Sequence, residues 1–122
     1  MLDKPENIII KFNHLIHEEK IFLKSDLTIK ELSLLIGTNY KYISKALRIY
    51  FEKDFRMLIN EYRIQYAKDI LVSDEYKNCS IDYVSYLCGF KSRTTFYKHF
   101  KRVTSLTPFE FRSEYNNFDY LV

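Results

Sequence analysis

The sequence contains little glycine and little proline, with two residues of each among 122. Sandwiches and barrels need many glycine turns, so this scarcity argues against them and favours helices joined by short turns. No apolar run approaches the ~20 residues that a membrane-spanning helix needs. Asp3, Lys4 and Glu6 interrupt any signal-peptide core, so we expect a cytoplasmic protein that makes no membrane contact.

Cysteine is also scarce, and side chains for metal binding or catalysis are few. Cys79 and Cys88 are the only cysteines, and without an export signal we expect both to be reduced and to act as small hydrophobes. His14 and His17 form an H-x-x-H pair, but a zinc site needs further ligands and none is evident. No nucleophile–base arrangement or glycine-rich phosphate loop is present. We therefore expect no metal, no cofactor and no enzymatic activity.

Positive charge is concentrated in two segments. Residues 39–51 contain three Lys or Arg residues and no acidic residue, and residues 91–102 contain five and again no acidic residue. The rest of the chain has more acidic than basic residues, although the net charge of the whole is +3. Basic residues gathered in this way are the expected footprint of a nucleic-acid binder.

Apolar residues recur at the spacing of helices along most of the chain. Pro5 suits the start of a first helix, which we expect to reach about Lys20. A long helix is expected over 55–72, and a last helix should start at the Thr107–Glu110 capping box and end near Tyr115. Two shorter helices have expected core positions at Ile29, Leu32, Leu35 and Ile36, and at Ile43, Leu47 and Tyr50.

A unit of helix, glycine turn and helix occurs twice, at an offset of 52 residues before the turn and 53 after it. Thr28 and Ser80 are the expected N-caps of the first helices, Gly37 and Gly89 make the turns, and Asn39 and Ser92 cap the second helices. Each copy matches the helix-turn-helix unit, whose second helix fits the major groove of DNA.

Helical geometry, at 100° per residue, indicates which side chains of the second helices face outward. The expected inward residues are Ile43, Leu47 and Tyr50 in one copy and Phe96, Phe100 and Val103 in the other. The candidate DNA-binding residues are Tyr40, Lys41, Ser44, Lys45, Arg48, Arg93, Thr94, Tyr97, Lys98 and Lys101. A basic helix face is usually only a solvated face, but its duplication and the absence of acids favour DNA binding.

Three stretches carry a family resemblance: "TIKELSLLIGTNYKYISKAL", "FRMLINEYRIQYAKDIL" and "SIDYVSYLCGFKSRTTFYKHFKRVTSLTPFEFR". Residues 27–112 resemble the AraC/XylS family DNA-binding domain, most specifically in the third stretch. The resemblance implies an all-α fold of about seven helices, with two helix-turn-helix subdomains joined by a long linker helix. It also implies sequence-specific binding of double-stranded DNA by a transcription regulator, with recognition helices at 39–51 and 92–103.

The expected division of the chain follows from this resemblance. Residues 1–53 form an N-terminal helix and the first subdomain, 54–73 the linker helix, 74–116 the second subdomain and 117–122 a tail. A sensor or dimerisation domain is missing, so we expect a fragment of a larger regulator, with RNA polymerase as a candidate further partner. The family usually has glycine where this chain has Glu52 and Ser105, which predicts either strain or a rebuilt turn.

Three further interpretations remain open from the sequence. Arg63 matches an arginine of the family, and the sequence favours a structural role for it. Backbone N–H groups at the Thr28 and Ser80 helix starts are candidate phosphate contacts. The alternative function is a helical protein-interaction module that does not bind DNA, which the aromatic content of 17% keeps open.

Overall fold

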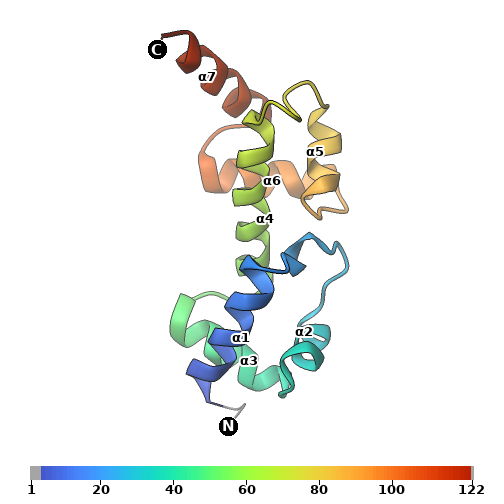
Figure 1. Ribbon diagram of the computed structural model, residues 1–122, viewed down its shortest axis with the longest axis vertical. Coiled ribbons are helices and arrows are strands. Elements are labelled where there is room, and N and C mark those ends of the chain that lie inside the picture. The colour runs from blue at the N-terminus through green and yellow to red at the C-terminus, as the bar shows by residue number, and fades with distance from the viewer. Residues whose placement is uncertain (1–3, 122) are drawn as a thin grey trace. The chain divides into compact units, whose positions relative to one another are not determined.

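The computed structural model describes the backbone of residues 4–121 and the side chains of residues 4–116. This part of the chain holds seven α-helices, one short 3-10 helix and no strand (Figure 1). The elements are α1 (Pro5–His17), η1 (Ile21–Leu23), α2 (Ile29–Ile36), α3 (Tyr40–Phe51), α4 (Phe55–Val72), α5 (Ile81–Leu87), α6 (Arg93–Thr104) and α7 (Pro108–Leu121). The predicted all-α fold is confirmed. No helix in the described range is long and apolar enough to cross a membrane.

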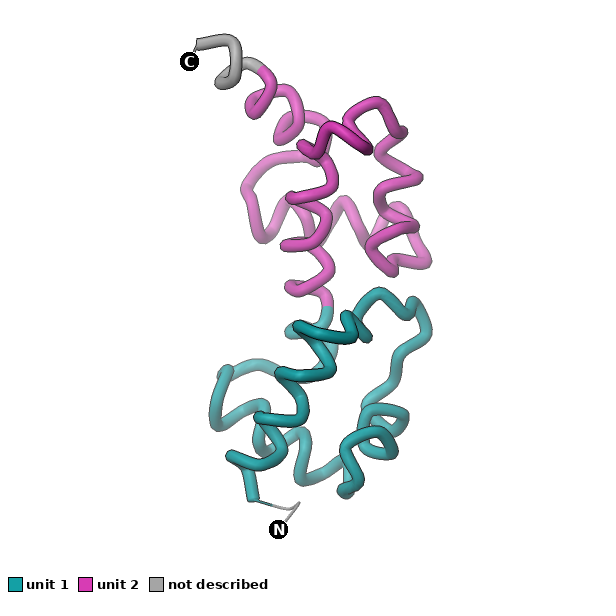
Figure 2. Tube along the Cα trace, in the orientation of Figure 1, with its two compact units in different colours: residues 1–59 teal, residues 60–122 magenta. Residues whose placement is uncertain are grey.

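The chain divides into two compact units, residues 1–59 and 60–122 (Figure 2). The division falls inside α4, so this helix contributes residues to both units. Each unit contains one of the two predicted helix-turn-helix pairs: α2 and α3 in the first, α5 and α6 in the second.

The first unit is built around α1, which packs on α3 and α2. Ile8, Phe12 and Ile16 form the fully buried side of α1, at the i, i+4, i+8 spacing of one helix face. The ring of Phe12 lies 5.9 Å from that of Phe51, centroid to centroid. The N-terminal helix is therefore part of the core that holds α3 in place.

The second unit has an aromatic core along α6. The centroids of Phe90 and Phe96 lie 5.2 Å apart, those of Phe96 and Phe100 5.7 Å, and those of Phe100 and Phe111 5.5 Å. Phe96 and Phe100 have no exposed surface, and Cys88 is buried in the same cluster. Burial raises the pKa of the Cys88 thiol to about 12, as expected for an inert core cysteine.

The predicted caps and turns are present in both copies. Side chains of Thr28, Asn39, Ser80 and Ser92 each accept a hydrogen bond from a backbone N–H in the first turn of the helix that follows. Gly37 and Gly89 have φ values of 88° and 92°, which favour glycine because a Cβ atom is disfavoured there. These turns set the direction in which each second helix leaves the first.

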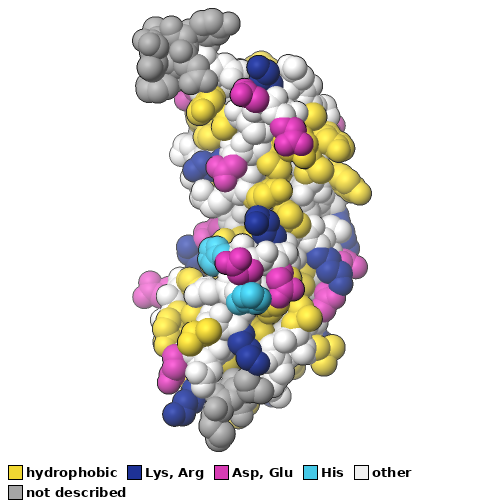
Figure 3. Space-filling view, viewed as in Figure 1, with side chains coloured by type: hydrophobic (Ala, Val, Ile, Leu, Met, Phe, Trp, Pro, Cys, Tyr) yellow, Lys and Arg dark blue, Asp and Glu magenta, His cyan; other side chains and the backbone are white. Residues whose placement is uncertain are grey.

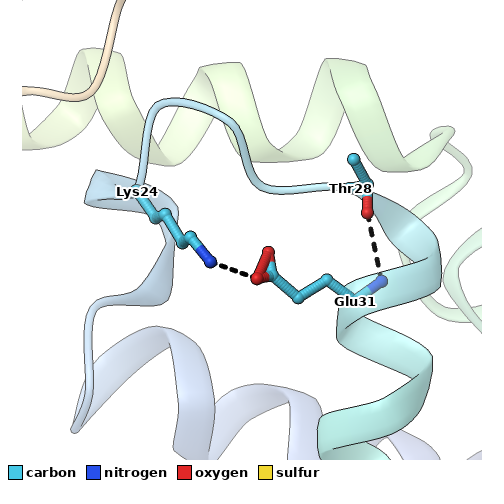
Figure 4. A network of polar contacts seen from close by, with 3 residues as sticks. All are labelled: Lys24, Thr28 and Glu31. Atoms are coloured by element: carbon cyan, nitrogen blue, oxygen red, sulfur yellow. Dashed lines mark hydrogen bonds and ion pairs between the residues drawn. The ribbon is translucent and has the colours of Figure 1, made fainter.

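The T-x-x-E motif at the start of α2 forms only part of a capping box. Thr28 Oγ1 accepts from the Glu31 N–H at 3.1 Å, but the Glu31 carboxylate pairs with the Lys24 ammonium (Figure 4). The Thr107–Glu110 box is reciprocal: Thr107 N–H donates to Glu110 Oε1 at 2.8 Å, and Glu110 N–H donates to Thr107 Oγ1 at 3.1 Å. These bonds hold the pKa of Glu110 below its usual range.

Several expectations about helix faces and ends are wrong. Leu35 and Tyr50, predicted to be inward, are 54% and 48% exposed, and Ala46 is buried instead. The first helix ends at His17, not near Lys20, because Lys20 is left-handed (φ 51°) and leads into η1. The last helix continues past Tyr115 to Leu121. Residues 117–122, which were predicted as a tail, have side chains outside the described residues.

The two positions without the family glycine keep a left-handed backbone. Glu52 has φ 58° and Ser105 has φ 66°, and they are the C-caps of α3 and α6. The turn is therefore retained with strained residues rather than rebuilt, since an L-residue is disfavoured in this conformation.

Candidate nucleic-acid interface

The outer side of α6 is polar and basic because its inner side is held by the core. Buried Phe96 and Phe100 fix the rotation of the helix, and Ser92 Oγ accepts from Thr95 N–H at its start. Four of the predicted residues on this helix are exposed: Arg93, Thr94, Lys98 and Lys101. The fifth, Tyr97, is half-buried and packs edge-on against the Phe96 ring, so it belongs partly to the core.

Arg93 is held by contacts from two helices. Its Nε lies 3.2 Å from Oδ1 of Asp82, which is in the first turn of α5. Its guanidinium carbon lies 5.2 Å from the centroid of the Tyr97 ring. The sequence did not predict the Asp82 contact, although a charge reversal between the copies marks the position: Lys30 stands there in the first copy.

An open hollow of about 480 Å³ lies beside the outer face of α6. Its lining residues are Tyr97, Lys98, Lys101, Arg102 and Thr107. Arg102 and Thr107 were not among the predicted binding residues. Arg102 could have been found from the acid-free charge run, whereas Thr107 comes from the turn before α7 and only the fold brings it there.

The outer side of α3 presents a smaller set of charges. Lys41, Lys45 and Arg48 are exposed and Ser44 is half-buried, while Ile43, Ala46 and Leu47 form the buried side. Tyr40 is 39% exposed at the first helical position. Tyr42 and Ile49 are also exposed, so this helix is more apolar outside than α6.

The face of the molecule that Figure 3 shows carries mixed charge. On the face of the molecule in Figure 3, Asp and Glu side chains lie beside Lys and Arg side chains. The acid-free basic stretches at residues 39–51 and 91–102 are a property of the sequence.

Arg63 on α4 is in a buried polar network of the second unit. Its exposed fraction is only 8%, its Nη1 donates to Asn60 Oδ1 at 3.2 Å, and its guanidinium carbon lies 5.7 Å from the centroid of the Phe90 ring. Burial lowers the pKa of Arg63 from its usual value. These contacts agree with the structural role that the sequence favours.

The predicted H-x-x-H pair does not gather further ligands. His14 Nε2 lies 3.3 Å from Glu19 Oε2, and the described residues contain no group of three or more His, Cys, Asp or Glu side chains placed to hold a metal ion. Cys79 and Cys88 are free thiols.

The chain is similar in sequence to known transcriptional regulators. The chain is 29% identical over 105 residues to an HTH-type transcriptional regulator from Staphylococcus aureus, covering 85% of this chain and 14% of that protein. It is 25% identical over 114 residues to another from Pseudoalteromonas carrageenovora, covering 93% of this chain and 64% of that protein. The chain thus spans less than two thirds of the length of these relatives.

Solved structures share the same helical arrangement. The C-terminal domain of AraT, a response regulator from Geobacillus stearothermophilus, matches with a TM-score of 0.74 and 20% identity over 88% of this chain and 84% of that one. The C-terminal domain of the response regulator yesN from Fusobacterium nucleatum matches with a TM-score of 0.70 and 22% identity over 83% and 97%. The sequence model of the helix-turn-helix domain matches residues 32–114. The chain therefore belongs to the AraC-type helix-turn-helix family, the DNA-binding domains of transcription regulators.

Proposed function

We propose that the chain binds specific sites on double-stranded DNA, with α3 and α6 each entering a major groove. One observation carries this proposal: in each unit, the second helix of the helix-turn-helix pair has a buried apolar side and an outer side with cations and no acid. The major groove admits an α-helix, and its phosphates attract such a surface.

The exposed side chains divide into two roles by their chemistry. Lys45, Arg48, Lys98 and Lys101 neutralise phosphates, which positions the helices. Arg93 reads a guanine, because a guanidinium can engage O6 and N7 together. The remaining candidates contact phosphates or thymine methyl groups at the edges: Tyr40, Lys41, Ser44, Thr94 and Tyr97.

The duplication in sequence also bears on the form of the target. Two copies in the same order along the chain favour a direct, non-palindromic site of two boxes. Helices in successive major grooves would read boxes about 10 bp apart, one helical turn.

The length of the relatives supports a place in a larger regulator. Because the chain spans 14% of the Staphylococcus aureus relative and 64% of the Pseudoalteromonas relative, the same domain occurs there within longer proteins. We propose the same here, with a sensor or dimerisation domain elsewhere in the regulator and RNA polymerase as a further partner.

Selection from randomised duplexes, followed by footprinting, tests the proposal. The expected result is an enriched direct site with two protected boxes. Lys45→Ala with Arg48→Ala should weaken protection of one box, and Lys98→Ala with Lys101→Ala that of the other. Lys77→Ala, an exposed lysine of the 73–80 loop, is the control and should weaken neither. One protected box would mean that one helix alone engages, and no enrichment would favour a protein-interaction module.

A further inference from the structure

The Arg93 side chain is contacted from two directions in the second unit. Asp82 on α5 meets its Nε at 3.2 Å, and the Tyr97 ring lies under its guanidinium at 5.2 Å. Tyr97 is itself anchored, because its ring stands at 88° to that of fully buried Phe96, with centroids 5.8 Å apart. The core of the unit therefore supports Arg93 through Tyr97, and α5 supports it through Asp82.

These contacts leave one edge of the guanidinium available. Within residues 4–116, Arg93 makes this ion pair through Nε and this contact with the Tyr97 ring, and no hydrogen bond or ion pair through Nη1 or Nη2. Guanidinium donors come in a fixed fork, so binding at Nε restricts the direction of the two Nη groups. The fork that remains can meet O6 and N7 of a guanine.

The charge of Asp82 acts on DNA as well as on Arg93. A carboxylate next to a DNA-binding helix repels phosphates, and that repulsion lowers affinity for every sequence equally. Only a base that engages Arg93 well compensates for this cost, so the pair favours discrimination over affinity.

The first copy lacks this arrangement. At the offsets of the repeat, Lys30 stands where Asp82 is and Tyr40 stands where Arg93 is. Neither an acid nor an arginine is available there, so the two recognition helices differ in how they can read a base.

We propose that Asp82 is a positioning residue that sets the preference of Arg93 for guanine. This rests on the proposed function, because it requires α6 to enter the major groove. Arg93 and Asp82 have side chains 67% and 58% exposed, and such pairs contribute little to the stability of the free protein. In the groove, where water is displaced, the same pair is strengthened. Its effect therefore belongs to DNA discrimination rather than to folding.

The test compares binding of the full chain to the selected duplex and to duplexes changed one base pair at a time. Arg93→Ala identifies the base pair that Arg93 reads, as the position where preference falls by roughly 5- to 150-fold. Asp82→Ala should lower preference at that same base pair by at least about 5-fold, while binding to unrelated duplex stays equal or tightens. Asp82→Glu should restore part of the preference. Asp74→Ala removes an exposed acid that faces Lys77, and should leave preference unchanged.

The double variant separates positioning from an independent contact. If Asp82 acts through Arg93, Asp82→Ala in an Arg93→Ala background should change preference no further. An additional loss there would overturn the proposal, as would unchanged preference in Asp82→Ala when Arg93→Ala relaxes it. In both cases the chain would still bind DNA, so the proposed function would not be contradicted. If the wild-type chain bound no duplex at all, the proposed function would fail first. Urea unfolding of Asp82→Ala should give one cooperative transition and only the small loss of stability expected when an acid leaves the first turn of a helix, which shows that the change in preference is not a folding defect.

Discussion

The Nδ2 atom of Asn60 on α4 lies 3.2 Å from Nε2 of His99 on α6. Asn60 Oδ1 already accepts from Arg63 Nη1, so its amide donates to the imidazole and Nε2 of His99 is the acceptor. The proton of His99 then sits on Nδ1, an atom that is buried without a hydrogen-bond partner among the described residues. This geometry needs the neutral imidazole.

Protonation of His99 should destabilise the second unit at acid pH. Burial, and then the charges of Arg102 and Lys98, lower the pKa of His99 in the folded protein. The unfolded chain therefore binds more protons, and the free energy of unfolding falls as pH drops below about 6.5 towards the folded pKa. Urea unfolding at a series of pH values should show this loss in wild type and a smaller loss in His99→Gln. Equal loss in both proteins would rule out this account, because His14 and His17 are present in each.

Leu32 and Leu35 offer a matched pair on α2. Leu32 is fully buried whereas Leu35 is 54% exposed. Leu32→Ala should lower the free energy of unfolding by about 2–5 kcal/mol, because it removes buried methyl groups and leaves a cavity. Leu35→Ala should change it by less than about 0.5 kcal/mol. Chemical denaturation of the two variants measures both, and similar losses would contradict the assigned helix face.

This pair shows the limit of sequence periodicity. At 100° per residue, Leu35 lies about 60° from Leu32, still within a broad apolar stripe. The elements that pack on α2 decide which edge of the stripe is covered. One of them is α1, which ends more than ten residues before α2 begins in the sequence. The same reason applies on α3, where Tyr50, predicted to be inward, is 48% exposed, and Ala46, for which the sequence made no prediction, is buried.

Other features could be read directly because they are local. The 55–72 helix has the predicted bounds, and all four predicted caps accept the expected N–H bonds. Helix caps depend on neighbours within three or four residues. The Arg93–Asp82 pair joins two helices across a turn. The residue periodicity within either helix therefore does not predict it. The candidate interface was thus visible in outline from charge and repetition, while its contacts required the fold.

Arg112 connects α7 to the end of α4 and the loop that follows. Its three nitrogens donate to backbone carbonyls: Nε to Leu71 at 2.9 Å, Nη1 to Cys79 at 2.8 Å and Nη2 to Tyr76 at 3.3 Å. Lysine cannot reproduce this fork, so Arg112→Lys should cost about 1–3 kcal/mol in the free energy of unfolding. Arg102→Lys, at an exposed position of α6, is the charge-matched control and should cost less than about 0.5 kcal/mol. If both substitutions had equal effects in urea titrations, the carbonyl contacts would not be stabilising.

Glycine should stabilise the two strained helix ends. Glu52 and Ser105 are left-handed, a conformation that costs an L-residue about 1–2 kcal/mol, and glycine avoids most of this cost. Glu52→Gly and Ser105→Gly should each raise the free energy of unfolding by about 0.5–1 kcal/mol, after the loss of chain entropy is subtracted. Gln65→Gly, within α4, should instead lower it by about 1 kcal/mol. Thermal and urea unfolding give the sign of each change in stability. A loss of stability in both Glu52→Gly and Ser105→Gly would refute the assignment of strain to these positions.

The salt dependence of DNA binding tests the central claim most directly. Equilibrium binding to the selected duplex, measured between about 50 and 200 mM salt, should give log K that falls linearly with log salt, with a slope of roughly −0.9 per phosphate neutralised. Removing Lys98 and Lys101 together should make the slope shallower by about 1.8 if each contacts one phosphate. The Lys77→Ala control should keep the wild-type slope. Absence of binding at about 50 mM salt, where phosphate contacts are strongest, or binding that does not depend on salt, would contradict the account.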